Sequence, residues 1–208
     1  MSSPIRPYRG VSAENRKAQR RARLLEAGLD LLGTVGYEQT TMTAVCARAK
    51  LTERYFYESF RGREELLVAV VDQVAEEIRD TALRALREHP GDPAAKARAA
   101  LSSFVDLLTE DPRKGRAALV ESLASQALRS RRHELLQTFA SLVVTQAQAL
   151  FGPAALPPPR DEVNALLFVG GLAELLVAWL SGEIEAGPAD IVDAAAHQFA
   201  TGLHTGLE

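Results

Sequence analysis

Apolar and polar positions along this chain follow the period of a helix. Apolar side chains recur three and four residues apart in segment after segment, and no stretch alternates every second residue as a half-buried strand would. Glycine, proline and capping residues separate the segments. The pattern predicts an all-α protein with about nine helices.

The long helices in this pattern begin and end at recognisable signals. Asp92-Pro93 and Asp111-Pro112 each combine an N-capping carboxylate with proline at the first helical position. Asp161 is expected to cap the most apolar helix, and the run from Arg129 to His133 is expected to separate two helices. The expected ranges are a first helix from Ser12 or Asn15 to Gly36, and later helices over 63–88, 93–110, 114–128, 133–151, 163–180 and 188–204.

Residues 40–67 have a different organisation, with two short helices joined by a tight turn. Thr41 to Thr43 offers a hydroxyl cap for the first helix, Ala49-Lys50-Leu51 forms the turn, and Thr52 caps the second helix, which runs from Glu53 to Tyr57. This is the plan of a helix-turn-helix, whose second helix enters the major groove of DNA. A surface helix pair with aromatic packing is the alternative explanation of the same spacing.

The polar side chains of this stretch suit contact with DNA. Arg54 and Tyr55 lie where base edges would be met, and an arginine can bond O6 and N7 of guanine together. Other members of the stretch are placed to reach phosphate, which fixes register but carries no sequence information. The residues that we expect to bind DNA are Thr41, Thr43, Lys50, Thr52, Glu53, Arg54, Tyr55, Tyr57 and Arg63.

Residues 16–67 resemble the DNA-binding signature of TetR-family transcriptional regulators. The resemblance rests on Ala49-Lys50-Leu51-Thr52, Phe56-Tyr57, Phe60 and the run from Arg63 to Leu67, preceded by Gly36-Tyr37 and the run from Thr40 to Thr43. It implies a dimeric, ligand-responsive regulator, most often a repressor, with a DNA-binding head and a helical body. The rest of the chain is similar to the family only in length and helical plan.

The stretch departs from the family's pattern in two places. Lys50 stands where the family usually has glycine in the turn, and a left-handed backbone is less favourable for lysine. Glu53-Arg54-Tyr55 replaces a trio that is more often small or basic. The operator sequence therefore cannot be transferred from relatives.

Charge is divided unevenly along the chain. Residues 1–63 hold 12 Lys and Arg against 6 Asp and Glu, a net charge of +6, whereas residues 64–208 hold 12 against 21, a net charge of −9. A basic head on an acidic body suits selective attraction to nucleic acid. We expect a disordered basic arm (1–12), a helix-turn-helix DNA-binding domain (13–62) and a ligand-binding and dimerisation domain (63–208).

Composition also indicates the compartment. The single cysteine, Cys46, excludes an internal disulfide, which suits the reducing cytoplasm, and it is expected to be a small core residue. No uninterrupted apolar run reaches the length of a membrane span, and the N-terminus lacks the apolar core of a signal peptide. The expectation is a cytoplasmic protein with no membrane partner.

The helix expected over 163–180 is apolar around too much of its circumference for the surface helix of a monomer. Paired with the helix over 188–204, it would form half of a four-helix bundle across a two-fold axis, as in TetR-like regulators. A fully buried central helix in a monomer is the alternative. The interface of the expected homodimer comprises Leu166, Val169, Gly170, Val177, Ile191, Ala195 and Phe199.

The body helices would enclose a chamber for a small-molecule ligand. If its walls are apolar with few polar groups, the ligand is mostly hydrophobic. Glu121, Gln146 and Glu174 are polar exceptions that could orient a ligand, pair across the dimer or face water, and ordinary core packing explains the apolar members equally well. The expected ligand-binding residues are Phe104, Leu108, Glu121, Leu123, Phe139, Gln146, Phe168, Leu172, Glu174 and Trp179.

The sequence gives little support to catalysis, a cofactor or a metal. It has no Gly-rich phosphate loop, and His197 and His204 are two helical turns apart, too far to share one metal ion. The expected function is a transcriptional regulator released from a palindromic double-stranded operator by its ligand, with the helix over 63–88 as the lever. The alternative is a helical small-molecule carrier whose head no longer binds DNA, which Lys50 and Glu53 leave open.

Overall fold

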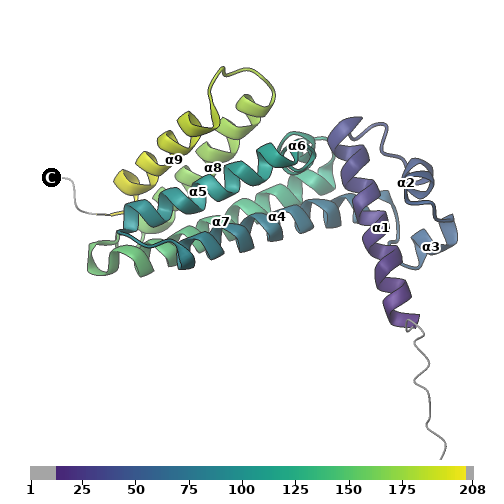
Figure 1. Cartoon of the computed structure of the whole chain (residues 1–208), viewed down its shortest axis with the longest axis horizontal. Coiled ribbons are helices and arrows are strands. Elements are labelled where there is room, and N and C mark those ends of the chain that lie inside the picture. The colour runs from purple at the N-terminus through teal and green to yellow at the C-terminus, as the bar shows by residue number, and fades with distance from the viewer. Residues whose placement is uncertain (1–12, 205–208) are drawn as a thin grey trace, which may run out of the picture.

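The computed structural model describes residues 13–204 as an elongated bundle of helices with a small head at one end (Figure 1). The described residues contain no β-strand, only an isolated bridge between Ala155 and His204. The predicted all-α fold is therefore confirmed. The basic arm predicted for residues 1–12 lies outside the described residues.

The head consists of α1 (Ala13–Thr34), α2 (Met42–Ala49) and α3 (Glu53–Tyr57), and α4 (Arg63–Glu88) runs from it into the body. Phe56 and Leu66 are fully buried in the core that these helices share, and the Phe60 ring lies 5.8 Å from that of Phe56. Cys46 is also buried there. Burial, and secondly the charge of Glu53, raises the pKa of its thiol, which makes it a poor nucleophile at neutral pH.

The turn between α2 and α3 keeps its left-handed geometry although lysine occupies it. Lys50 has φ 53° and ψ 46°, and the N–H of Leu51 bonds to the carbonyl of Cys46 at 2.9 Å. Arg23 of α1 donates to the carbonyls of Ala49 and Lys50, which places a cation at the C-terminus of α2. Thr41 caps α2 as predicted, by accepting from the N–H of Ala44 at 3.2 Å. Thr52 makes no such bond to α3.

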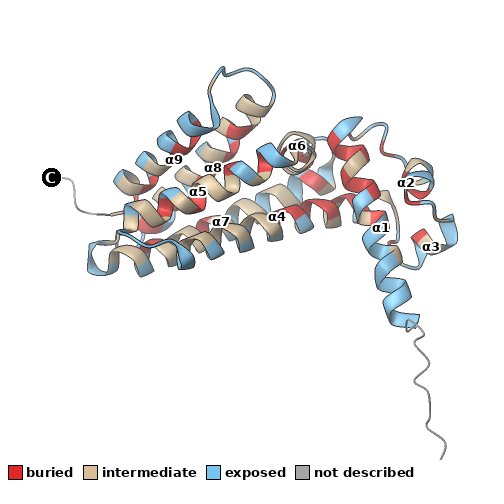
Figure 2. Cartoon of the chain, in the orientation of Figure 1, coloured by how far each residue is buried: buried red, intermediate tan, exposed pale blue. Residues whose placement is uncertain are grey.

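The body is built from α5 (Pro93–Glu110), α7 (Gln126–Phe151), α8 (Arg160–Leu180) and α9 (Pro188–Gly202). α5 and α7 pack against α4, α8 packs against α7, and α9 packs against α5 and α8. α4 and α7 leave the head side by side and in the same direction (Figure 1). The buried residues of the body lie between the helices (Figure 2).

The segment between α5 and α7 differs from the prediction. In place of one helix over 114–128, the chain forms a short α6 (Pro112–Gly115), a π-helical turn (Arg116–Val120) and a 3₁₀ turn (Glu121–Leu123). Ser125 then caps α7 by accepting from the N–H of Leu128 at 3.2 Å. We call residues 112–123 the junction segment.

Two helix starts in the body also differ from the prediction. The run from Arg129 to His133, expected to separate two helices, lies inside α7, because Ser125 starts that helix earlier and the arginines are accommodated by ion pairs to α4 and α8. Asp161 is not the cap of α8. It lies in the first turn, where it is buried and accepts a hydrogen bond from Gln148 at 3.4 Å. Its negative charge there is still stabilised by the dipole at the N-terminus of the helix.

One helix of the body, α8, is long and apolar enough to span a membrane by length and composition alone. One side of it packs inside the bundle through Val169, Ala173 and Leu176. The other side exposes Val163 (56%) and Leu167 (69%). In a single chain, α8 therefore leaves an apolar face without a partner.

Gly33 allows α1 to approach the junction segment closely. A Cβ at this position would lie 2.6 Å from the Cα and the carbonyl oxygen of Arg113, and backbone cannot move aside at low cost. We expect Gly33→Ala to lower the free energy of unfolding by about 1–3 kcal/mol, measured by urea denaturation. Gly202→Ala is the control, because a Cβ there meets nothing within 4 Å. Equal destabilisation by both changes would contradict this packing.

Candidate nucleic-acid interface and body cavity

The second helix of the helix-turn-helix, α3, turns its apolar side inward and its polar side outward. Phe56 points into the head core, whereas the side chain of Arg54 is 86% exposed and Tyr57 is 59% exposed. Thr52 and Glu53 at the start of the helix are also exposed. α3 lies at the outer end of the molecule, on the side of α1 that faces away from the bundle (Figure 1).

Arginines of α1 hold α3 in this position. The guanidinium of Arg20 lies 4.5 Å from the ring centroid of Tyr55 and donates to Glu58 at 3.1 Å. Arg21 stacks in the same way over Phe60, at 4.4 Å. Arg20 and Arg21 therefore have a structural role in the head, and Tyr55 is half-buried beneath an arginine rather than free on the surface.

The other residues predicted to bind DNA fall into two groups. Thr43 and Lys50 are exposed beside α3. Arg63 is half-buried, with its guanidinium 4.0 Å from the centroid of the Tyr37 ring and 3.5 Å from a carboxylate oxygen of Glu64. The hydroxyl of Thr41 accepts the capping hydrogen bond of α2.

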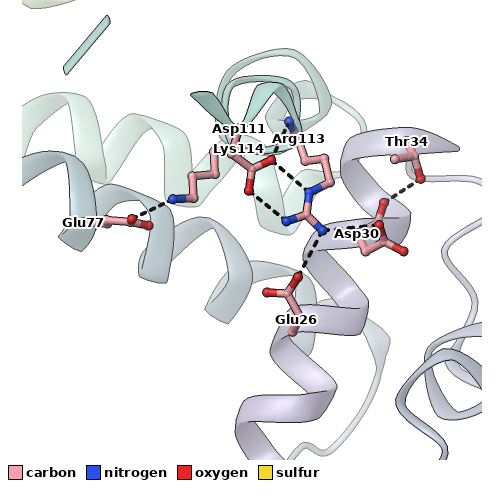
Figure 3. A network of polar contacts seen from close by, with 7 residues as sticks. All are labelled: Glu26, Asp30, Thr34, Glu77, Asp111, Arg113 and Lys114. Carbon is pink, nitrogen blue, oxygen red and sulfur yellow. Dashed lines mark hydrogen bonds and ion pairs between the residues drawn. The ribbon is translucent and has the colours of Figure 1, made fainter. Parts of the chain in front are cut away.

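The head is fastened to the body by a polar network around Arg113 of α6 (Figure 3). The guanidinium of Arg113 donates two hydrogen bonds to Asp111, at 2.8 and 2.9 Å. From the same group, Nη1 reaches Glu26 at 3.0 Å and Asp30 at 3.3 Å, both on α1. Lys114 ties the junction segment to Glu77 of α4 at 2.6 Å.

A second set of contacts joins the end of α1 to the π-helical turn. Glu121 accepts from the backbone N–H of Tyr37 at 3.0 Å, and its other oxygen lies 3.3 Å from Arg116. Arg116 also donates to the carbonyl of Thr34 at 3.4 Å. The Tyr37 hydroxyl donates to Glu64 at 2.5 Å, and Ser125 donates to the other oxygen of the same carboxylate at 2.7 Å.

These contacts keep two carboxylates next to the junction segment, those of Glu64 and Asp111, ionised. Burial opposes the charge on Glu64, but hydrogen bonds from Tyr37 and Ser125 and the charge of Arg63 outweigh it and lower the pKa of Glu64. The hydrogen bond from Arg113 is the main cause of the lowered pKa of Asp111. A lowered folded-state pKa adds stability above the pKa of the unfolded chain, about 4, and this stability is lost as the pH falls through the folded value. Acid therefore weakens the junction.

The body contains an apolar cavity of about 190 Å³ between α4, α5, α7 and α8. Of the residues predicted to bind a ligand, it is lined by Phe104, Phe139, Gln146, Phe168 and Leu172. Ala118 and Leu119 of the π-helical turn also belong to its wall. An apolar cavity of about 150 Å³ stays dry and accommodates benzene, so this one has room for a larger apolar group.

The other residues predicted to bind a ligand lie outside this cavity, each for a local reason. Leu108 is fully buried against neighbouring helices, and Leu123 is 43% exposed. Glu121 belongs to the junction, and Glu174 forms an ion pair with Arg132 at the surface. Trp179 packs at another point of the core and donates to the carbonyl of Ala186 at 2.9 Å.

Most of the residues predicted to form the dimer interface are buried within the chain. Val169, Ile191, Ala195 and Phe199 are at most 8% exposed, because the apolar side of α9 packs into the chain's own core. A second copy cannot contact these side chains in this arrangement. Leu166 is 43% exposed, and a Cβ on Gly170 would meet nothing within 4 Å. Among these predicted positions, the surface that a second copy can reach is therefore the outer face of α8.

The fold and the head together define a helix-turn-helix DNA-binding protein with a helical body. Residues 24–70 match the model of the bacterial regulatory proteins of the tetR family. No curated protein sequence matches the chain significantly. The match covers the whole helix-turn-helix and the start of α4, so this part of the chain is similar to the DNA-binding domain of TetR-family transcriptional regulators.

Solved structures share the fold over almost the whole chain. A TetR-like transcriptional regulator from Rhodococcus has a TM-score of 0.66 at 19% identity, covering 89% of this chain and 96% of that one. The fatty acid degradation regulator FadR from Bacillus halodurans has a TM-score of 0.73 at 16% identity, with 89% and 97% covered. A TetR-family regulator from Marinobacter aquaeolei has a TM-score of 0.61 at 20% identity, with 92% and 100% covered. At these identities the likeness concerns the fold alone.

Arg54 is the one arginine of α3, and we expect it to read a base. Because its side chain is 86% exposed, we expect Arg54→Ala to leave the free energy of unfolding within about 0.5 kcal/mol of wild type. It should weaken binding to a selected operator by about 1–3 kcal/mol, measured by fluorescence anisotropy. Arg84→Ala, an exposed position of α4 outside the head, is the control. Unchanged operator affinity in Arg54→Ala would contradict its role.

Proposed function

We propose that this protein is a homodimeric repressor that a mostly hydrophobic small molecule releases from a palindromic operator. The observation that carries the proposal is the double contact of the π-helical turn. Ala118 and Leu119 belong to the cavity wall, while Arg116 and Glu121, in and next to the same turn, bond to the end of α1. A ligand that moves the wall therefore acts directly on a contact that orients the head.

Two connections carry the change from body to head. α4 is continuous from the head core to the cavity, so it acts as the lever expected from the sequence. The junction segment is the second connection, held to α1 by Arg113 and to α4 by Lys114. π-Helical turns inside helices are frequently found at functional sites. The ligand shifts the equilibrium only by the difference in its affinity for the two states.

The outer face of α8 is the proposed dimer interface. It exposes Val163, Leu166 and Leu167, and Gly170 and Gly171 leave room for a neighbouring helix, since a Cβ on either meets nothing within 4 Å. A second copy that covers this face would explain why it is apolar, and no contact with a membrane is then needed. A dimer on this face would bring two α3 helices to successive major grooves if their separation is about 34–36 Å.

The head and the body have different roles in this proposal. The head, residues 13–62, binds DNA through Thr43, Lys50, Thr52, Arg54 and Tyr57, which are exposed together. The body, residues 63–208, binds the ligand and the second copy. The regulator works in the cytoplasm, where its DNA is found. The carrier hypothesis requires a head without DNA affinity, although α3 presents an arginine and polar groups outward.

Selection from a pool of random DNA duplexes, at two salt concentrations, tests the proposal. We expect a palindrome to be enriched, and its affinity to fall steeply with salt because phosphate contacts release counterions. A library of apolar compounds is then screened for release of the selected duplex. A folded dimer that enriches no sequence would favour the carrier. A ligand that binds the body but leaves operator affinity unchanged would overturn the proposed regulation.

A further inference from the structure

One arginine in the wall of the body cavity is only partly paired. Arg132 of α7 lines the cavity, and its side chain is 16% exposed. One terminal nitrogen of its guanidinium bonds to Glu174 of α8. The Nε atom is buried and has no hydrogen-bond partner among the described residues. A buried donor of this kind is costly unless a partner arrives, so the unpaired Nε is a position that a ligand can complete.

The existing partner of Arg132 does not neutralise the cavity. Glu174 is 65% exposed, so its attraction is weakened by solvent. Within the described part of the chain, no Asp or Glu lines the cavity, whereas a second cation, Arg79, does. Among residues 13–204, the one acid that forms an ion pair with Arg79 is its chain neighbour Asp80, at 2.9 Å. The walls therefore favour an anion and disfavour a cation.

The shape of the cavity places a second requirement on its ligand, which must be long and apolar. Its lining on α4 extends from Val71 to Leu86, which corresponds to about 22 Å along a helix axis. Arg132 lies at the end near Val71, because the adjacent Arg131 bonds to Asp72 at 2.5 Å. Gln146 lies about 21 Å further along α7, toward the other end. Between these two polar groups the walls are almost wholly apolar.

We propose that the body cavity binds a linear aliphatic carboxylate, with the carboxylate on Arg132 and the chain directed toward Gln146. An arginine fork matches the two oxygens of a carboxylate, and Nε of Arg132 supplies a donor that has no partner among the described residues. The inference rests on the proposed function only in taking this cavity as the effector site. It names the chemical class of the effector.

The position of Arg132 also gives the carboxylate a regulatory consequence. The same end of the cavity contains Ala118 and Leu119 of the π-helical turn, whereas Gln146 lies near the far end. A carboxylate fixed on Arg132 therefore places the first part of the chain against the junction segment. The apolar chain supplies most of the binding free energy, and the charge fixes its direction.

The test compares an acid with the alcohol of the same chain length. Decanoate and decanol are titrated into the full-length protein by calorimetry, with wild type, Arg132→Gln and Arg132→Lys. In wild type we expect decanoate to bind roughly 10- to 100-fold more tightly than decanol. Arg132→Gln should remove this preference without changing the affinity for decanol, and Arg132→Lys should restore part of it. Arg84→Gln, an exposed position that does not line the cavity, is the matched control.

The outcomes separate this inference from the proposed function. Equal affinity for acid and alcohol in wild type, loss of both ligands in Arg132→Gln, or no binding of decanoate would each overturn the assignment of Arg132. Operator affinity is measured in the same samples. If the acid binds through Arg132 but leaves the operator bound, the inference stands and the proposed regulation fails. If both probes release the operator equally, the regulation stands and the inference fails.

Discussion

The orientation of the head depends on one guanidinium. Arg113 bonds to Asp111, just before the junction segment, and to Glu26 and Asp30 of α1. Gly33 has no side chain, so the backbone of α1 can approach Arg113 closely. The pKa of Arg113 is raised, chiefly by its hydrogen bond to Asp111, so its charge persists at any pH at which the protein folds. Without this contact, the head would be joined to the body only through α4 and the hydrogen bonds that Arg116 and Glu121 make to the end of α1.

The neighbouring π-helical turn connects the contact between Arg113 and α1 to the body cavity. Ala118 and Leu119 of this turn belong to the cavity wall. Arg116 of the turn and Glu121, the residue that follows it, bond to Thr34 and Tyr37 at the end of α1. The helix-turn-helix is in turn held on α1 through Arg20 and Arg23. A continuous set of packed and bonded groups therefore runs from the cavity to α3. Contacts of this kind can carry energetic coupling between a ligand in the body and α3.

Much of this architecture could be predicted from the sequence because it depends on local rules. Helical periodicity gave the all-α class, capping residues marked the starts of α2 and α5, and the turn kept its geometry despite Lys50. The junction segment was mispredicted as a regular helix because a π-helical turn departs from the 3.6-residue period on which the prediction rests. Its local sequence contains no signal for that change.

The remaining errors concern partners that are distant in the sequence. Glu121 resembled a polar group in a ligand chamber, but the N–H that it binds belongs to Tyr37, 84 residues away. Arg132 was part of an expected polar joint, and only the packing of α7 against α8 places it in the cavity wall. Likewise, the apolar stripe of α9 shows that one side of the helix is buried, but it cannot distinguish the chain's own core from a second copy.

The most direct test of the account is the coupling between ligand and operator in wild type and in Arg113→Gln. The affinity for the selected operator is measured with and without a ligand that fills the cavity. In wild type, the ligand should weaken operator binding by the same factor by which the operator weakens ligand binding, as linkage requires. Arg113→Gln should bind the ligand with unchanged affinity but lose most of this coupling. Undiminished coupling in Arg113→Gln, with the variant folded, would show that the signal does not pass through the junction segment.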